Sequence, residues 1–160
     1  MRPLCILYKS VAVKTDLQQT LDQKMIETDE QFVEANGIHL AYDTFGNPSD
    51  PPLLLVMGLG MQMLAWDDLF CEHLAIKGYW VIRFDNRDIG RSSKLDAAAT
   101  PGIWQMISAG LFHRPFSAPY RLKDMASDTV GLMDALDIRA AHVVGASMGG
   151  MIAQEIAIHQ

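Results

Sequence analysis

Apolar and polar positions predict an alternation of strands and helices from about residue 30 onward. Two apolar runs, 31–34 and 38–44, flank Ala35-Asn36-Gly37. Asn-Gly between such runs is a strong hairpin signal, because both residues tolerate positive φ. Residues 53–57 read Leu-Leu-Leu-Val-Met without polar alternation, which predicts a strand buried on both faces. The pattern therefore predicts an antiparallel hairpin followed by a strand of the parallel type.

A helix should follow the buried strand. It is expected to begin at 66–68, where acidic residues suit a first turn, and to stop at Gly78. Its apolar side would consist of Phe70, Leu74 and Ile76. The turn between strand and helix contains two glycines, at positions considered below.

The same alternation continues to the end of the sequence. Residues 80–84 and 141–144 are apolar runs of strand length, and apolar residues recur at spacings of three and four over 122–136. Residues 151–158 are rich in alanine and isoleucine, which predicts a further helix. Strands alternating with helices indicate the α/β class, with parallel strands joined by right-handed crossover helices.

Two segments lie outside this alternation. Residues 1–28 form a leader, for which a short amphipathic helix and an unstructured tail are alternatives, and the tail is the preferred interpretation. Residues 93–119 form an apolar insertion, which either covers a pocket or packs on the surface as a helical excursion. The predicted domain therefore spans 29–160 and includes this insertion.

Composition narrows the possible functions. The chain has 160 residues, of which 49% are hydrophobic and 20% charged, enough for one globular domain. A net charge of −6 offers no basic surface for nucleic acid or anionic lipid, and no apolar run reaches membrane-spanning length. Cys5 and Cys71 have no metal-ligand spacing and indicate a reducing, cytoplasmic compartment. We expect no metal and no organic cofactor.

The pentapeptide 145–149, Gly-Ala-Ser-Met-Gly, lies between the last predicted strand and the last helix. A G-x-S-x-G sequence at a strand–helix junction predicts a sharp turn that exposes the serine hydroxyl. Ser147 would adopt a strained backbone conformation, and side chains at Gly145 and Gly149 would collide with nearby backbone. The amide of Met148 would point to where an oxyanion forms.

Several segments, in this order and spacing, resemble the N-terminal half of an α/β-hydrolase. They are 53–58, 66–67, 83–92 and 142–150. Within that family, the Met-Gly at 57–58 and Asp88 resemble the aclacinomycin methylesterase branch. The Ser-Met-Gly-Gly at 147–150 is also similar to enol-lactone hydrolases and cofactor-free haloperoxidases.

The resemblance implies a serine hydrolase acting on a small-molecule ester or lactone through an acyl-enzyme. Ser147 would be the nucleophile, and the amides of Leu59 and Met148 would form the oxyanion hole. Gly58 and Gly60 would let bare backbone approach the substrate closely. The same resemblance implies that Asp85 braces the loop after its strand rather than acts in catalysis.

A serine nucleophile needs a base, which in this fold follows it in sequence with its acid. Only 13 residues follow Ser147. Glu155 and His159 would lie roughly 12 and 18 Å along the last helix from the serine. His142, expected to be a core or crossover histidine, is roughly 16 Å upstream along a strand. His113, in the insertion, is the one histidine that spacing does not exclude.

We therefore expect the first half of an enzyme, truncated after the helix that follows Ser147. Without the base and its acid, this half should not turn over substrate by itself. The strand 141–144 would then form an exposed sheet edge capable of self-association.

Two other functions remain open. Gly58-x-Gly60 before a helix, with Asp85 after the next strand, partly matches a dinucleotide-binding fingerprint, but Met63 occupies the third glycine position. The second is a non-catalytic hydrolase-like module that binds a small apolar ligand or a partner through the open edge. The missing base supports this second alternative.

Overall fold

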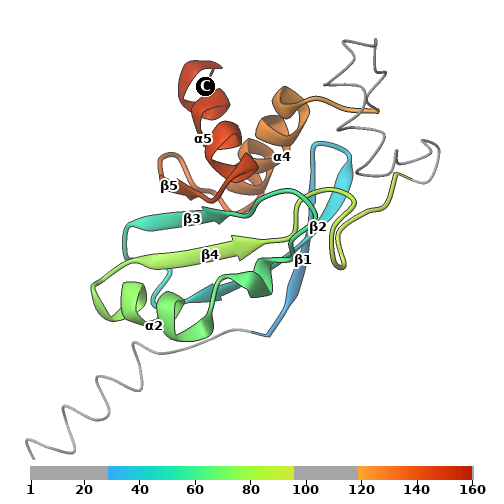
Figure 1. The fold of residues 1–160 in the computed structure, drawn as a ribbon. Coiled ribbons are helices and arrows are strands. Elements are labelled where there is room, and N and C mark those ends of the chain that lie inside the picture. The colour runs from blue at the N-terminus through green and yellow to red at the C-terminus, as the bar shows by residue number, and fades with distance from the viewer. Residues whose placement is uncertain (1–28, 96–118, 160) are drawn as a thin grey trace, which may run out of the picture.

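The computed structural model describes residues 29–95 and 119–159, which form a mixed five-stranded sheet with helices on both faces (Figure 1). The strands are β1 (Gln31–Ala35), β2 (Ile38–Phe45), β3 (Pro52–Val56), β4 (Trp80–Phe84) and β5 (His142–Gly145). The helices are the 3₁₀ turn η1 (Met63–Ala65), α2 (Asp68–Ile76), α4 (Leu122–Ala135) and α5 (Met148–His159). The predicted leader and residues 96–118 of the predicted insertion lie outside the described residues.

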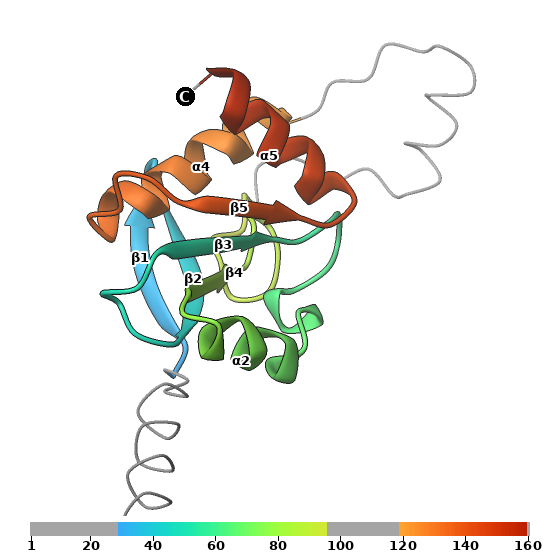
Figure 2. The same ribbon diagram turned by 90° about the vertical axis from the view of Figure 1, so that its left-hand side faces the viewer.

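The strand order is β1-β2-β4-β3-β5. β3 pairs in parallel with β4 on one side and with β5 on the other, whereas β2 pairs antiparallel with β4. Helices α4 and α5 cover one face of the sheet and α2 covers the other, as the rotated view shows (Figure 2). The predicted α/β class, with crossover helices between parallel strands, is confirmed.

The predicted hairpin forms around Asn36 and Gly37, whose φ values are +50° and +76°. β1 and β2 pair antiparallel from Ala35 opposite Ile38 outward. The Asn36 side-chain amide also donates a hydrogen bond to Asp128 of α4 at 2.8 Å. The turn residue is therefore anchored to a helix as well as closing the hairpin.

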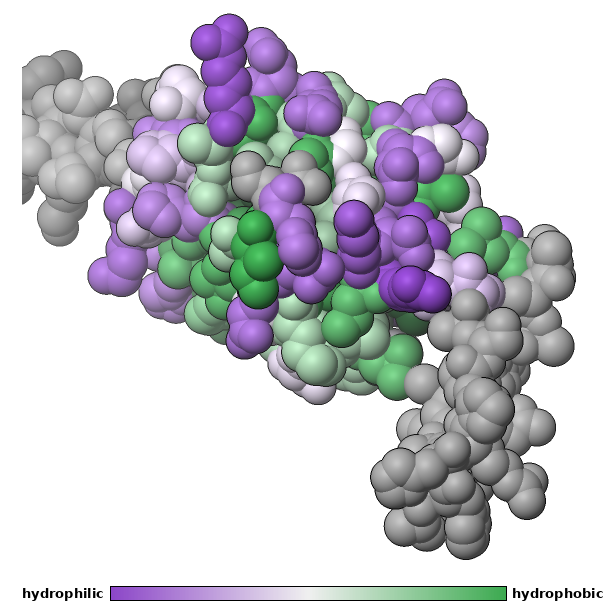
Figure 3. Space-filling view, turned by 90° about the horizontal axis from the view of Figure 1, so that it is seen from above, coloured by the Kyte–Doolittle hydropathy of each residue, from purple (hydrophilic) through white to green (hydrophobic). Residues whose placement is uncertain are grey.

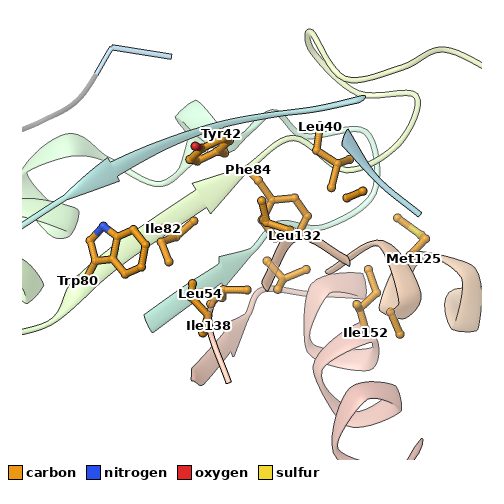
Figure 4. Close-up of a cluster of buried hydrophobic side chains, with 13 residues drawn as sticks. Leu40, Tyr42, Leu54, Trp80, Ile82, Phe84, Met125, Leu132, Ile138 and Ile152 are labelled. Carbon is orange, nitrogen blue, oxygen red and sulfur yellow. The ribbon is translucent and has the colours of Figure 1, made fainter. Parts of the chain in front are cut away.

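β3 separates two hydrophobic clusters, because alternate side chains of a strand point to opposite faces. Leu54 and Val56 pack with residues of α4 and α5, and Figure 4 shows Leu132 and Ile152 of those helices in this cluster. Leu53 and Leu55 face α2 instead. Burial on both faces explains why this strand carries no polar alternation.

Helix α2 begins at Asp68, two residues later than the start of the predicted range. Asp67 is its N-cap, and its carboxylate accepts a hydrogen bond from the Leu69 amide at 3.0 Å. Trp66 precedes the helix and closes the η1 turn. The acidic residues of the predicted first turn therefore do act at the helix N-terminus, one as its cap. Gly78, with a φ of +91°, follows the C-cap as expected.

The predicted apolar side of α2 is wrong in two of its three residues. Phe70 and Ile76 are 42% and 39% exposed. Cys71 and Ala75 are fully buried instead, one turn apart on the face that meets the sheet. Small side chains let this helix approach the sheet closely, so hydrophobicity alone did not identify the buried face.

Helices α4 and α5 differ in how much of their apolar surface is covered. In α4, Met125 and Thr129 of the predicted periodic set are buried, and Leu132 is buried in place of the predicted Met133, which is partly exposed. In α5, only Gly149 and Ile152 are buried, although the helix is apolar around its circumference. The side of the molecule that carries α4 and α5 displays hydrophobic residues among hydrophilic ones (Figure 3).

An ion pair that the sequence pattern did not predict lies inside the sheet layer facing α2. Arg83 of β4 and Asp43 of β2 are direct cross-strand neighbours, and their side chains are 1% and 6% exposed. Arg83 also pairs with Asp68 of α2 at 2.7 Å and donates to the Trp66 carbonyl. Burial lowers the pKa of Arg83, but its carboxylate hydrogen bonds outweigh this and raise it, so the guanidinium stays charged.

The buried thiol gives a test of this packing. Burial raises the pKa of the Cys71 thiol to about 11, so little thiolate forms near neutral pH. At pH 8 we expect alkylation by iodoacetamide to be about 100-fold slower in the folded chain than in urea, because the thiolate reacts. Mass spectrometry of a Cys5→Ser variant would measure Cys71 alone. Equal rates with and without urea would contradict the packing of α2.

Candidate active site

Ser147 occupies the tight junction between β5 and α5, with a φ of +54°. Positive φ is costly for a residue with a side chain, by about 1–2 kcal/mol. The junction is closed by hydrogen bonds from Gly149 N to the Ala146 carbonyl at 2.8 Å and from Gly150 N to the Ser147 carbonyl at 2.9 Å. The predicted strand–turn–helix geometry around the serine is confirmed.

The two flanking glycines are required by close backbone contacts. A Cβ atom on Gly145 would lie 2.1 Å from the Gly149 carbonyl oxygen. A Cβ atom on Gly149 would lie 2.1 Å from the carbonyl oxygen of Val56, at the end of β3. Rigid backbone cannot move aside as a flexible side chain can. A side chain at either position would therefore collide with backbone, as the sequence predicts.

The turn after β3 lies beside the serine. A Cβ atom on Gly58 would meet the Ser147 Cβ at 3.1 Å and its Oγ at 3.6 Å. Gly60 has a φ of +74°, and apart from its chain neighbours no atom of residues 29–95 or 119–159 lies within 4 Å of its Cβ position, so the backbone conformation rather than crowding by these residues favours glycine there. Leu59, between them, is 53% exposed. The first strand–helix turn and the serine turn therefore meet at the carboxyl ends of β3 and β5.

The loop after β4 supports this turn. Asp85, 3% exposed, accepts hydrogen bonds from the amides of Met63 at 2.7 Å and Arg91 at 3.1 Å. Both carboxylate oxygens of Asp85 thus bind backbone amides, which is consistent with the expected role in bracing the loop. Asn86, 2% exposed, donates from its side chain to the Met57 carbonyl at 2.9 Å. Sequence reasoning did not identify Asn86, because a polar residue in a polar loop gives no local signal.

A second buried ion pair fixes α4. Arg87 binds Asp128 through two hydrogen bonds of 2.6 Å, and Asp128 also accepts the hydrogen bond from Asn36. These contacts raise the pKa of Arg87, chiefly through the hydrogen bond to Asp128. The guanidinium therefore joins the loop after β4 to α4, and Asp128 in turn joins α4 to the hairpin.

No described side chain serves Ser147 as a base. In residues 29–95 and 119–159, nothing hydrogen-bonds to Ser147 Oγ, and His113 lies outside these ranges. His142 begins β5, at the opposite end of the strand from the serine, and is exposed with its ring edge-on to Tyr79. Of the two expected settings for His142, core or crossover, the core is therefore excluded. His159 lies 3.4 Å from Glu155 on α5.

The described ranges also contain no group of three or more His, Cys, Asp or Glu side chains arranged to hold a metal ion. None of the helices they contain is long and apolar enough to span a membrane.

Comparison with known proteins adds the following. A sequence model described as the α/β hydrolase fold matches residues 51–159. The chain is 38% identical over 135 residues to rhodomycin D methylesterase DauP from Streptomyces sp. (strain C5), covering 84% of this chain and 37% of that protein. It is 32% identical over 125 residues to 3-oxoadipate enol-lactonase 2 from Acinetobacter baylyi, covering 78% of this chain and 38% of the relative.

A solved structure gives the same result. The enol-lactonase from Burkholderia xenovorans LB400 superposes with a TM-score of 0.63 at 26% identity, covering 81% of this chain and 42% of the enol-lactonase. The chain thus spans less than half the length of these proteins, and 37% of the length of the methylesterase.

The strained serine predicts a measurable gain in stability on substitution. Ser147→Gly should raise the free energy of unfolding by about 0.5–1 kcal/mol, because relief of positive φ exceeds the added entropy of the unfolded chain. Ser147→Ala keeps the strain and should stay within about 0.5 kcal/mol of the parent. Urea unfolding would compare the three proteins, and a glycine variant less stable than the alanine variant would contradict the strain.

Proposed function

Because the chain belongs to the α/β-hydrolase fold family, we propose that Ser147 is the nucleophile of an ester or lactone hydrolysis through an acyl-enzyme. The observation that carries the proposal is the serine at positive φ beside the turn after β3. This arrangement exposes the hydroxyl at the N-terminus of α5, where the helix dipole favours developing negative charge. The rhodomycin D methylesterase and enol-lactonase relatives support a small-molecule ester or lactone as the substrate.

In the proposed reaction, Ser147 Oγ attacks the acyl carbon and its proton passes to a base. The carbonyl oxygen becomes an oxyanion that accepts hydrogen bonds from the amides of Leu59 and Met148. One such donor stabilises the transition state by about 3 kcal/mol. The tetrahedral intermediate then expels the alkoxide, which takes the proton back from the base, and water hydrolyses the acyl-enzyme to the carboxylic acid and free Ser147.

The proton acceptor is the component that the described residues lack. Without a base, the hydroxyl remains a weak nucleophile at neutral pH. We therefore expect the 160-residue chain by itself to turn over ester substrates very slowly.

The non-catalytic alternative is supported by the same observation. A Ser147 Oγ without a hydrogen-bond partner in the described part of the chain suits a module that binds a ligand or partner without cleaving it. The dinucleotide-binding alternative is disfavoured by family membership and by the antiparallel β2 beside β4. A cytoplasmic location and the absence of nucleic-acid and membrane partners remain predictions.

An active-site probe separates the alternatives. A fluorophosphonate should modify Ser147 slowly and stoichiometrically, with p-nitrophenyl acetate hydrolysis close to the uncatalysed rate. Ser147→Ala should abolish the modification, whereas Ser49→Ala, an exposed serine before β3, should leave it unchanged. Peptide mapping by mass spectrometry would locate the adduct. Modification elsewhere, or none after prolonged incubation, would favour the non-catalytic module, and fast turnover would reveal a base within the chain.

The exposed edge supports a further proposal, that the chain self-associates through β5. Among the described residues this strand pairs with β3 alone, and Val144 on it is 41% exposed. Unpaired backbone groups at a sheet edge can pair with the same edge of another copy. On α5, which packs against β5, Met151 and Ile158 are 49% and 71% exposed and would add apolar contact.

Light scattering after size exclusion would test this association. The parent chain should show a mass that rises with concentration, and Val144→Lys should remain a monomer, because a lysine at the edge opposes strand pairing. Ile76→Lys is the matched control, since that residue is exposed on α2, across the sheet. A parent chain that is monomeric throughout, or an equal effect of both lysines, would contradict the proposal.

A further inference from the structure

The turn between β3 and η1 makes few hydrogen bonds of its own. Its one internal backbone bond runs from Met61 N to the Gly58 carbonyl and is long, at 3.4 Å. Within the described ranges, the amides of Leu59 and Gly60 donate to nothing. A donor that must bind an oxyanion has to remain free in this way, so the Leu59 N–H cannot itself help to hold the turn. Its rigidity must come from contacts on either side.

Those contacts come from side chains at the end of β4 and at the start of the loop after it. Asn86 holds the Met57 carbonyl at 2.9 Å, immediately before the turn. Asp85 holds the Met63 amide at 2.7 Å, at the start of η1. Arg83 binds the Trp66 carbonyl and Asp68 where α2 begins. Side chains of β4 and of the loop after it therefore hold the chain on both sides of the turn.

We propose that Asn86 is a positioning residue that fixes the orientation of the Leu59 amide, an inference that rests on the proposed function of that amide. The Met57 carbonyl belongs to the Met57–Gly58 peptide unit, so a hydrogen bond to this oxygen fixes the plane of that unit. The next peptide unit carries the Leu59 N–H. Asp85 anchors the far end of the segment, four residues beyond Leu59.

The geometry around Asn86 suits this role. The side chain is 2% exposed and the Met57 residue 7% exposed, so water does not compete readily for the bond. Loss of the donor would leave a buried carbonyl unsatisfied, which favours rotation of the peptide toward solvent. The Gly58 backbone lies so near the serine that a Cβ atom added to it would be 3.1 Å from the Ser147 Cβ, which leaves little room for the turn to adjust. A displacement of about 1 Å in such a site can reduce the rate 100-fold.

Backbone ¹⁵N relaxation of the full chain tests the inference without requiring any reaction. In the parent, the order parameter of the Leu59 amide should be about 0.85, that of rigid backbone. In Asn86→Leu, which removes the donor, and Asn86→Asp, which keeps the shape but cannot donate when ionised, it should fall below about 0.6. Met148, on the other side of the site, should not change. Asn47→Leu, at an exposed asparagine in the loop before β3, is the matched control.

A phosphonate adduct at Ser147 gives a second measurement. In the parent, the amide proton resonances of Leu59 and Met148 should both move downfield, and in the Asn86 variants only that of Met148 should move. If neither moves in the parent, the proposed oxyanion hole fails, while the relaxation data still decide the role of Asn86.

Two results would overturn the inference. One is an unchanged Leu59 order parameter in both Asn86 variants. The other is a loss of order at Leu59 that extends equally to Met148 and the sheet, because Asn86 would then hold the whole fold rather than the turn.

Discussion

The close approach of the β5–α5 junction to the end of β3 is the contact on which the site depends. Gly149 lies so near the Val56 carbonyl that a Cβ there would be 2.1 Å from it, and the Ala146 amide donates to the same carbonyl at 3.0 Å. Parallel pairing of β3 with β5 brings these backbones together. The serine is placed by this contact beside the turn that leaves β3, and its positive φ is the local cost of the arrangement.

Buried polar side chains then connect this site to the rest of the molecule. The Asp43–Arg83 pair reaches the start of α2, and the Arg87–Asp128 pair joins the loop after β4 to α4. Removing one member of a buried ion pair typically costs about 3–5 kcal/mol, because the other charge is left without compensation. The arginines of both pairs lie on β4 and the loop after it. This part of the chain therefore holds the start of α2 on one side and α4 on the other.

The apolar surface is covered unevenly. α4 buries the face that its sequence periodicity identifies, whereas α5 and the edge of β5 leave large apolar side chains exposed. Exposed apolar side chains beside a strand edge form a surface on which another chain can pack and pair its backbone. Ser147 lies at the junction between β5 and α5, so this side chain and the exposed edge are close together.

Much of the fold and part of the site followed from the sequence. The Asn36-Gly37 turn, the buried β3 and the Gly-x-Ser-x-Gly junction are local features, because each depends on the φ preferences or polarity of neighbouring residues. Hydrophobic periodicity predicted the order of strands and helices, which the structure confirms. The resemblance to a known family identified the α/β-hydrolase fold, and the match over residues 51–159 confirms it.

Other features were decided only by tertiary structure. The partners of Arg83 and Asn86 lie 40 and 29 residues away, and no local pattern links such positions. The buried face of α2 depends on how closely the sheet approaches, which made Cys71 and Ala75 interior and left Phe70 exposed. Local propensity fixes turns and strands, whereas the pairing of distant polar groups depends on which segments the completed sheet brings within hydrogen-bond distance.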